Sequence, residues 1–509
     1  MNGVAVQAQT ISEEAVRLLT AVYGPEDAGM VWKSLCEALG PIKGALALKD
    51  KPITKRKLPL HQGDAILIAY GDQIVESERP PLQTLKYFLD RYLCESVSTV
   101  HLLPHFPYTS DDGFSVVDYK AVDPALGDWN DVQNLTENFR LMIDAVINHI
   151  SSKSDWFQYY LDGVPSYQNY FIEADPATDL SGVYRPRALP LLTPFSTRNG
   201  SRHVWTTFSA DQIDLNFANP QVFVEIIDVL LSYVKYGATL LRLDAVGFLW
   251  KELGTDCFHR PQTHMLVKLM RLVLDLVNPD VVLVPEINGP LQESTPYFGD
   301  GSDEAQMVYN FPLAPLTLDA FARGDASVLS GWLETLPQPT GQTTLFNFLA
   351  SHDGISVRSA SGLLTESQLQ QLVTLTESCG GKVNFRFGPQ GEKIPYELAT
   401  TLYDVLSVNY SQDEALARFH CAHAIMCSMA GVPGIYFHSF FGTSNWQEGY
   451  AKTQHARTLN RRKFELHELQ SLLEDSSSRA ARIHAAMTKL LKARAAEPAF
   501  HPAAPQKIL

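Results

Sequence analysis

The chain has 509 residues, of which 45% are hydrophobic and 19% are charged, so it is long enough for a large folded core and is not disordered. It carries 41 Lys and Arg residues against 56 Asp and Glu residues, and the net charge of −15 argues against nucleic acid or anionic lipid as partners, because both need a basic patch. No apolar run approaches the roughly 20 residues that a membrane-spanning helix requires.

Residues 1–62 are expected to form a helical extension and a linker. Residues 13–23 and 28–39 have a helical pattern, and a Lys/Pro stretch, DKPITKRKLP, follows at 50–59. The first thirty residues lack a basic start followed by an apolar segment, so we expect no secretion signal and a cytoplasmic location. The six cysteines are scattered without zinc-site spacing, which is typical of reduced thiols.

Eight short apolar runs follow at wide intervals, and none shows the alternation of a half-buried strand. They are 65–70, 97–104, 141–149, 238–246, 281–287, 306–311, 344–353 and 432–438. Helix-like stretches such as 220–236 and 263–277 lie between them. Strands buried on both faces that alternate with helices indicate an α/β protein with a parallel sheet, and eight such units predict a closed (β/α)8 TIM barrel.

Two connections are too long for simple crossovers, one after the third run and one after the seventh. The expected organisation is an extension at 1–62, barrel parts at 63–149, 217–353 and 413–509, an inserted domain B at 150–216 and an inserted loop domain at 354–412. Long loops at the carboxyl ends of barrel strands are the usual place of binding and catalytic residues. We therefore expect both insertions to face the active site.

Charged side chains end three of these runs. Asp244 lies near the end of the fourth run, two residues after Arg242; Glu286 lies near the end of the fifth, and Asp353 ends the seventh. A single Asp at such a place is more often a cap, and Arg242 with Asp244 is equally consistent with a structural ion pair. Three carboxylates at one barrel mouth instead favour retaining glycoside chemistry, with a nucleophile, an acid/base and a stabiliser of positive charge. Arg242 is expected to lower the pKa of Asp244, and the proton donor needs a raised pKa.

Four segments, DAVINH (144–149), LRLDAV (241–246), VPEING (284–289) and ASHDG (350–354), resemble in order the short motifs of the α-amylase superfamily, glycoside hydrolase family 13. The resemblance implies a (β/α)8 barrel and a double-displacement, retaining reaction on α-glucosides. Asp244 would be the nucleophile, Glu286 the acid/base and Asp353 the transition-state stabiliser. The residues expected to hold the glucosyl ring are Arg242, His149 and His352.

Further segments resemble the sucrose phosphorylase branch of that superfamily, among them residues 101–119, 182–190, 204–216 and 456–462. By this resemblance Asp111 and Arg457 would bind the non-reducing 4-hydroxyl. The residues expected to line the sugar site are Phe114, Phe208 and Gln212, and those expected to face the acceptor or phosphate are Tyr184 and Arg187. A guanidinium suits a phosphate because it donates hydrogen bonds in pairs.

The helical extension and the segments 258–264 and 297–311 are more similar to sugar phosphorylases that act on glucosylglycerate, and Phe248 stands where sucrose-specific members carry tyrosine. This implies reversible phosphorolysis of 2-O-α-glucosylglycerate to α-glucose 1-phosphate. Arg260, Arg187 or His264 would meet the glycerate carboxylate. We expect no metal and no cofactor beyond inorganic phosphate as co-substrate. The chain ends about where a C-terminal β domain begins in the family, so we expect that domain to be absent.

Three other functions fit the same catalytic residues or the same fold. The first is phosphorolysis of sucrose or sucrose 6′-phosphate, and the second is hydrolysis or transglucosylation, which the catalytic carboxylates do not distinguish from phosphorolysis. The third is an inactive barrel that serves as a scaffold, although all three carboxylates are present. The expected partners are a small-molecule sugar and phosphate, and a homodimer is possible.

Overall fold

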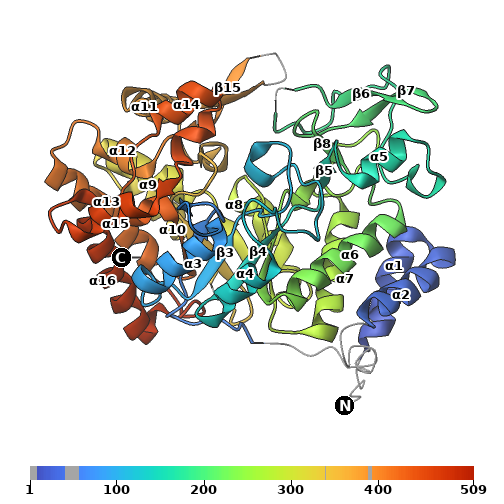
Figure 1. The fold of residues 1–509 in the computed structure, drawn as a ribbon, viewed down its shortest axis with the longest axis horizontal. Helices are drawn as coiled ribbons and strands as arrows, with labels where there is room; N and C mark the ends of the chain where they lie inside the picture. The colour runs from blue at the N-terminus through green and yellow to red at the C-terminus, as the bar shows by residue number, and fades with distance from the viewer. Residues whose placement is uncertain (1–8, 41–56, 188, 339, 388–391, 509) are drawn as a thin grey trace.

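The computed structural model describes residues 9–40, 57–187, 189–338, 340–387 and 392–508, and its centre is a parallel sheet of eight strands (Figure 1). The strands are β1 (Ile66–Ala69), β3 (Thr99–Leu102), β4 (Arg140–Ala145), β9 (Ala238–Leu243), β10 (Val282–Pro285), β11 (Met307–Asn310), β12 (Thr344–Phe348) and β16 (Val432–Tyr436). Each predicted apolar run forms one of them. The strands are shorter than the runs because the carboxyl ends of the runs enter the loops that carry the polar residues.

The sheet order is β10-β9-β4-β3-β1-β16-β12-β11, and every neighbouring pair is parallel. The two outermost strands, β10 and β11, lie beside each other, so the sheet is a nearly closed barrel, which confirms the predicted fold. Almost every strand residue is buried, as expected for strands with side chains in the barrel interior on one face and helices on the other.

Helices surround the barrel (Figure 1). The longer ones are α3 (Pro81–Tyr92), α6 (Pro220–Lys235), α7 (Pro261–Val277), α9 (Leu313–Arg323), α13 (Gln412–Ser428) and α16 (Arg479–Ala496). The shorter ones are α4 (Trp129–Asn134), α8 (Leu291–Ser294), α10 (Ser327–Leu333), α14 (Gln447–Thr453) and α15 (Leu466–Glu474). Each of α6 and α7 begins with proline, which suits the first helical position because the N–H there needs no helical partner. None of the described helices has the length and apolar character needed to cross a bilayer.

The N-terminal extension is a helical hairpin of α1 (Ile11–Tyr23) and α2 (Pro25–Leu39). The turn between them uses Gly24 at φ 87°, a conformation that glycine adopts without steric cost. The hairpin packs on α6 and α7, and the hydroxyl of Tyr23 donates to the carbonyl of Phe217 at 3.0 Å. The extension therefore covers the outside of the barrel on the side of β9 and β10. Most of the predicted Lys/Pro stretch 50–59 lies outside the described residues.

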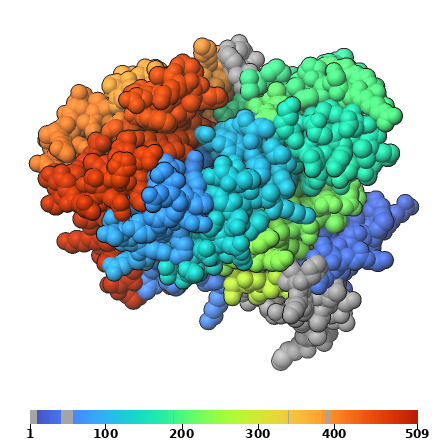
Figure 2. Space-filling view, in the orientation of Figure 1, coloured from blue at the N-terminus to red at the C-terminus, as the bar shows by residue number. Residues whose placement is uncertain are grey.

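The two long connections carry small sheets of their own. The first contains β5 (His149–Ser151), α5 (Asp155–Leu161), β6 (Leu192–Thr197), β7 (Gly200–Trp205) and β8 (Gln212–Asp214), with β5 paired to β8 and β6 to β7. The second contains β13 (Ile355–Ser356), α11 (Glu366–Ser378), β14 (Lys382–Phe387), β15 (Lys393–Ala399) and α12 (Leu402–Ser407). A small pairing of β2 (Ile74–Val75) with β17 (Phe464–Glu465) completes the strands. Figure 2 shows both insertions on the same end of the molecule, one green and one orange.

A buried ammonium group joins the first insertion to the barrel. Nζ of Lys251, which follows β9, lies 2.6 Å from Oδ2 of Asp214 on β8 and 2.8 Å from Oδ1 of Asn148 after β4. Asn148 also donates its Nδ2 to Oδ2 of Asp214 at 3.1 Å. Burial lowers the pKa of Lys251, and the carboxylate of Asp214 opposes this. The side chains of Lys251 and Asp214 are 3% and 0% exposed, so the ion pair depends on its own partners and not on water.

Replacing Lys251 by methionine is expected to leave Asp214 charged and buried without its cation. A broken buried pair costs about 3–5 kcal/mol of stability, and the apparent melting temperature of Lys251→Met is expected to fall accordingly. The matched control is Lys120→Met, because Lys120 pairs with Asp228 at the surface, where both side chains are nearly half exposed and such a pair contributes less than about 1 kcal/mol. Equal melting temperatures for the two variants would contradict this account.

Candidate active site

One cavity at the carboxyl ends of the barrel strands gathers most of the predicted site residues. Its wall contains Asp111, Phe114, His149, Tyr184, Arg187, Phe208, Gln212, Arg242, Asp244, Glu286, His352, Asp353 and Arg457. The three carboxylates come from the ends of β9, β10 and β12, and Tyr184, Arg187, Phe208 and Gln212 come from the first insertion. Parallel strands of a barrel end at the same mouth, which brings these residues together over long sequence distances.

Two predicted acceptor residues lie elsewhere. Arg260 is the residue before α7, and its Nη2 pairs with Glu252 at 2.9 Å. His264, in the first turn of the same helix, places Nδ1 2.9 Å from the buried carboxylate of Glu304 and packs on the ring of Tyr297. Neither residue belongs to the cavity wall. The structure therefore does not support the prediction that they contact a bound acceptor, because each is held by a carboxylate outside the cavity.

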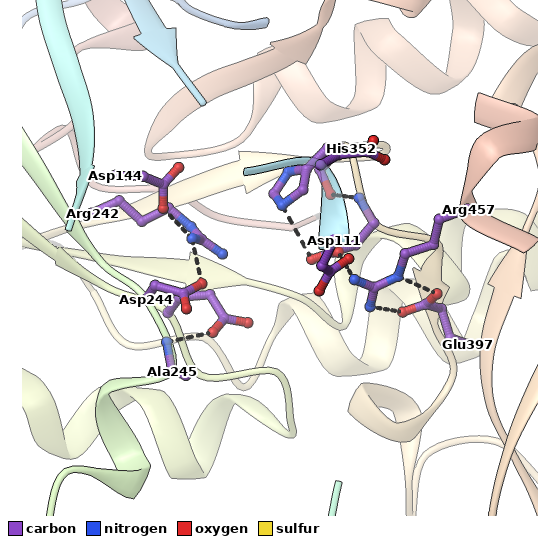
Figure 3. A network of polar contacts seen from close by, with 12 residues as sticks. Asp111, Asp144, Arg242, Asp244, Ala245, His352, Glu397 and Arg457 are labelled. Atoms are coloured by element: carbon purple, nitrogen blue, oxygen red, sulfur yellow. Dashed lines mark hydrogen bonds and ion pairs between the residues drawn. The ribbon is translucent and has the colours of Figure 1, made fainter. Parts of the chain in front are cut away.

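The nucleophile candidate is part of a buried charge cluster (Figure 3). Nη1 of Arg242 lies 2.7 Å from Oδ1 of Asp244 and also contacts Oδ1 of Asp144, which is on the neighbouring strand β4. Nε2 of His101 on β3 lies 2.7 Å from the other oxygen of Asp144. Arg242 and Asp244 are two residues apart along the chain, so both side chains point to the same side. Asp144 thus fixes the guanidinium that Asp244 contacts.

The pKa of Asp244 shifts in the direction opposite to the one predicted from the sequence. Burial raises it, and the guanidinium of Arg242 opposes the rise without cancelling it, while the nearby carboxylate of Asp144 adds to it. Sequence spacing revealed the cation but not the loss of solvent, which acts against any ionised carboxylate. Asp244 is 7% exposed. Its charged state therefore depends on Arg242.

Glu286 is in the environment that a proton donor needs. Its Oε2 accepts a hydrogen bond from the backbone N–H of Ala245 at 3.1 Å, and Ala245 itself has a left-handed φ of 47°. Among the described residues no Lys, Arg or His makes an ion pair with Glu286. Burial raises its pKa to about 7, Arg242 opposes this, and the carboxylates of Asp244 and Asp353 add to it. Two adjacent carboxyl groups with separated pKa values are the arrangement expected for a nucleophile and an acid.

Asp353 is held in its charged form by Arg457. Nη1 of Arg457 lies 2.6 Å from Oδ1 of Asp353, and the backbone carbonyl of Asp353 accepts a hydrogen bond from Asn460 at 2.8 Å. Burial acts to raise the pKa of Asp353, but the guanidinium of Arg457 and further cations outweigh it and hold that pKa well below its usual range. Asp353 therefore presents a fixed negative charge to the cavity.

Aromatic and polar side chains form the wall around these carboxylates. Phe114 and His352 stack with ring centroids 4.9 Å apart, and burial lowers the pKa of His352 to about 3, so its imidazole is neutral. Nε2 of His149 lies 2.9 Å from the backbone carbonyl of Phe114, to which Gln212 donates at 3.2 Å. His149 also packs on Phe208. Flat apolar faces beside neutral hydrogen-bonding groups suit a sugar ring.

The adjoining part of the wall, which Phe208 contacts through Phe248, is mainly aromatic and includes one guanidinium. Tyr184, Phe248 and Phe258 pack together with ring centroids 4.6 to 5.9 Å apart. Arg187 lies in the same wall, is half-buried and makes no hydrogen bond or ion pair with any residue of the described chain. The other arginines of the wall, Arg242 and Arg457, are paired with carboxylates. Arg187 is therefore the wall arginine that is available to an anionic ligand.

Several residues of the site were not found by sequence reasoning. Tyr396 lies in the cavity wall. Glu397 lies outside the wall and forms an ion pair with the wall residue Arg457. Both Tyr396 and Glu397 are on β15 in the second insertion. Arg461 contacts the carboxylate of Asp112 and the backbone carbonyl of His352. Arg461 lies in a segment with a recognisable motif, whereas nothing in the sequence marks the β15 residues. Within the described ranges, no cluster of three or more His, Cys, Asp or Glu side chains could bind a metal ion. That the protein needs no metal stays a prediction.

The sequence matches known proteins over most of its length. The family model of the α-amylase catalytic domain matches residues 91–380. A glucosylglycerate phosphorylase from Allomeiothermus silvanus is 54% identical over 462 residues, which cover 90% of this chain and 83% of that protein. A glucosylglycerate phosphorylase from Spirochaeta thermophila is 45% identical, over 97% of this chain and 84% of that protein.

Among solved structures, sucrose 6F-phosphate phosphorylase from Thermoanaerobacter thermosaccharolyticum superposes with a TM-score of 0.76 at 24% sequence identity, over 86% of this chain and 88% of that one. This similarity independently supports the barrel fold. The family itself is shown by the matched family model and by the relatives above 30% identity. The chain belongs to the α-amylase family, glycoside hydrolase family 13, in the branch that holds the sucrose and glucosylglycerate phosphorylases.

Proposed function

We propose that the chain is a retaining sugar phosphorylase that converts 2-O-α-glucosylglycerate and inorganic phosphate reversibly into α-glucose 1-phosphate and glycerate. The observation that carries the reaction type is the placement, in one cavity, of Asp244, Glu286 and Asp353 together with Arg187, whose guanidinium pairs with no carboxylate among the described residues. The two relatives that are 45% and 54% identical support glucosylglycerate as the donor. Glycerate and phosphate are both small anions, which fits a wall with one available arginine.

In the first half-reaction a carboxylate oxygen of Asp244 attacks the anomeric carbon as the bond from that carbon to the glycerate oxygen breaks. Glu286 gives its proton to the leaving oxygen, so glycerate departs as an alcohol and the glucosyl group stays on Asp244 as an ester. Asp353 stabilises the positive charge that develops on the ring. Arg242 holds Asp244 ionised and in position for the attack.

In the second half-reaction a phosphate oxygen attacks the anomeric carbon and displaces the carboxylate of Asp244. Two inversions at that carbon give α-glucose 1-phosphate with net retention. Glu286, now a carboxylate, accepts a proton when the incoming nucleophile carries one. Arg187 binds the phosphate in this step and the glycerate carboxylate in the first, since one acceptor leaves the site before the other enters. Water has no charge to bind Arg187, which favours phosphorolysis over hydrolysis.

Glycerate release in the first turnover is expected to depend on the protonated form of Glu286. A pKa raised to about 7 means that this form is present below pH 7 and is lost above it. Without phosphate, the first-turnover rate with glucosylglycerate is expected to fall about tenfold per pH unit well above pH 7. The rate with α-glucosyl fluoride, whose leaving group needs little protonation, is expected to stay nearly flat. The same steep fall with both donors would remove Glu286 from the role of acid.

Replacing Arg187 by alanine is expected to weaken phosphate use more than hydrolysis of the glucosyl-enzyme. A hydrogen bond to a charged group contributes about 1.5–3 kcal/mol, which is about a 10- to 150-fold loss in kcat/KM for phosphate. Arg260→Ala is the matched control, because its guanidinium pairs with Glu252 outside the cavity. The ratio of α-glucose 1-phosphate to glucose formed from α-glucosyl fluoride reports the effect. An unchanged ratio in Arg187→Ala would show that phosphate binds elsewhere.

The function itself is tested by product analysis with and without phosphate. The donor panel holds glucosylglycerate, glucosylglycerol, sucrose and sucrose 6′-phosphate, and the expected result is phosphate-dependent α-glucose 1-phosphate from glucosylglycerate. Asp244→Ala is expected to form no product, since no glucosyl-enzyme can form. Phosphate-dependent release from another donor would show that this donor is the substrate instead. Free glucose formed regardless of phosphate would indicate a hydrolase. No product from any donor would favour an inactive scaffold.

A further inference from the structure

Arg457 forms ion pairs with two carboxylates, Asp353 and Glu397, and contacts them differently; Figure 3 labels Arg457 and Glu397. Its Nη1 is 2.6 Å from Oδ1 of Asp353, a single contact. Its Nε and Nη2 donate to Oε1 and Oε2 of Glu397 at 3.0 and 2.6 Å, which is the paired geometry that guanidinium and carboxylate groups prefer. The stronger of the two interactions therefore points away from the proposed catalytic carboxylate.

Glu397 is fixed in this position by its surroundings and does not line the cavity. Its side chain is fully buried on β15, and Nδ2 of Asn384 on β14 donates to its Oε1 at 3.1 Å. The backbone of Gly354, the residue after Asp353, packs against the Glu397 side chain. A Cβ at Gly354 would lie 2.5 Å from Cγ of Glu397, so no larger residue fits there without a shift. Burial acts to raise the pKa of Glu397, but Arg457 outweighs this and keeps the pKa lowered, so the group is ionised.

The orientation of Arg457 determines what Asp353 can offer to a substrate. Oδ2 of Asp353 lies 3.7 Å from Nε2 of His352 and accepts no hydrogen bond from the described part of the chain. A guanidinium that was not held from behind would favour two N–H contacts with the same carboxylate, since that pairing is the more stable one. It would then cover both oxygens of Asp353 and take the place of sugar hydroxyls.

We propose that Glu397 is a positioning residue. By accepting two hydrogen bonds from Arg457, it keeps the guanidinium turned so that one oxygen of Asp353 stays open to the glucosyl ring. This inference rests on the proposed function and adds a residue to it from the second insertion. Glu397 acts through Arg457 and Asp353 and touches neither donor nor acceptor. Its contribution is to the transition state, in which Asp353 stabilises developing positive charge.

The test is Glu397→Gln, which keeps the shape and removes the charge, with Glu377→Gln on the exposed face of α11 as the matched control. Fluoride release from α-glucosyl fluoride is measured because it requires neither glycerate nor phosphate. We expect kcat to fall about 30- to 100-fold in Glu397→Gln, which is below the roughly 100- to 1000-fold loss seen when a stabilising group is removed outright, because Asp353 itself stays in place. The change in KM is expected to be smaller. Wild-type kcat together with a lowered melting temperature would show a purely structural role and overturn the proposal.

A double-mutant cycle separates action through Arg457 from an independent effect. In an Arg457→Ala background, Glu397→Gln is expected to lower kcat by no more than about twofold, because the group it positions is gone. A double variant whose loss of kcat equals the product of the two single losses would overturn the proposal, because the two residues would then act independently.

If Glu397→Gln does not fold, Asn384→Ala replaces it as the test variant. A several-fold loss of kcat is then expected, and an unchanged kcat would overturn the proposal. Failure of the wild-type protein to release fluoride would count against the proposed function instead.

Discussion

A carboxylate stays ionised inside a protein only when a cation or several hydrogen bonds replace the water it has lost, and the whole site depends on this constraint. Arg242 and Arg457 satisfy it in the same way. Each guanidinium contacts one carboxylate of the cavity wall and one behind the wall: Arg242 contacts Asp244 and Asp144, and Arg457 contacts Asp353 and Glu397. The rear carboxylates fix the cations, and the cations fix the charges that face the substrate.

Glu286 differs from the other carboxyl groups of the wall because no such cation contacts it. Within the described part of the chain its carboxylate accepts one hydrogen bond, from a backbone N–H, and its pKa rises to about 7. One cavity therefore holds charged carboxylates beside a carboxyl group that gains and loses its proton near neutral pH. The difference arises from where the arginines lie and not from the carboxyl groups themselves, which are chemically alike.

The barrel and the two insertions contribute different parts of the site. The ends of β9, β10 and β12 supply the three carboxylates. The first insertion supplies Arg187 for an anion, and the second supplies Glu397 behind Arg457. The ion pair of Lys251 and Asp214 holds the first insertion to the barrel. Both residues come from segments that are not part of the barrel, although they act at the mouth of its strands.

The sequence by itself determined the eight strands and the three carboxylates at their ends, because apolar runs and strand-end polar residues are local patterns that survive without knowledge of packing. It also identified most of the wall through motif resemblance. Only the tertiary structure decided that Arg260 and His264 lie outside the cavity, that burial outweighs Arg242 at Asp244, and that Glu397 holds Arg457. These features depend on the loss of solvent and on which side chains meet across long loops, and no local pattern encodes either.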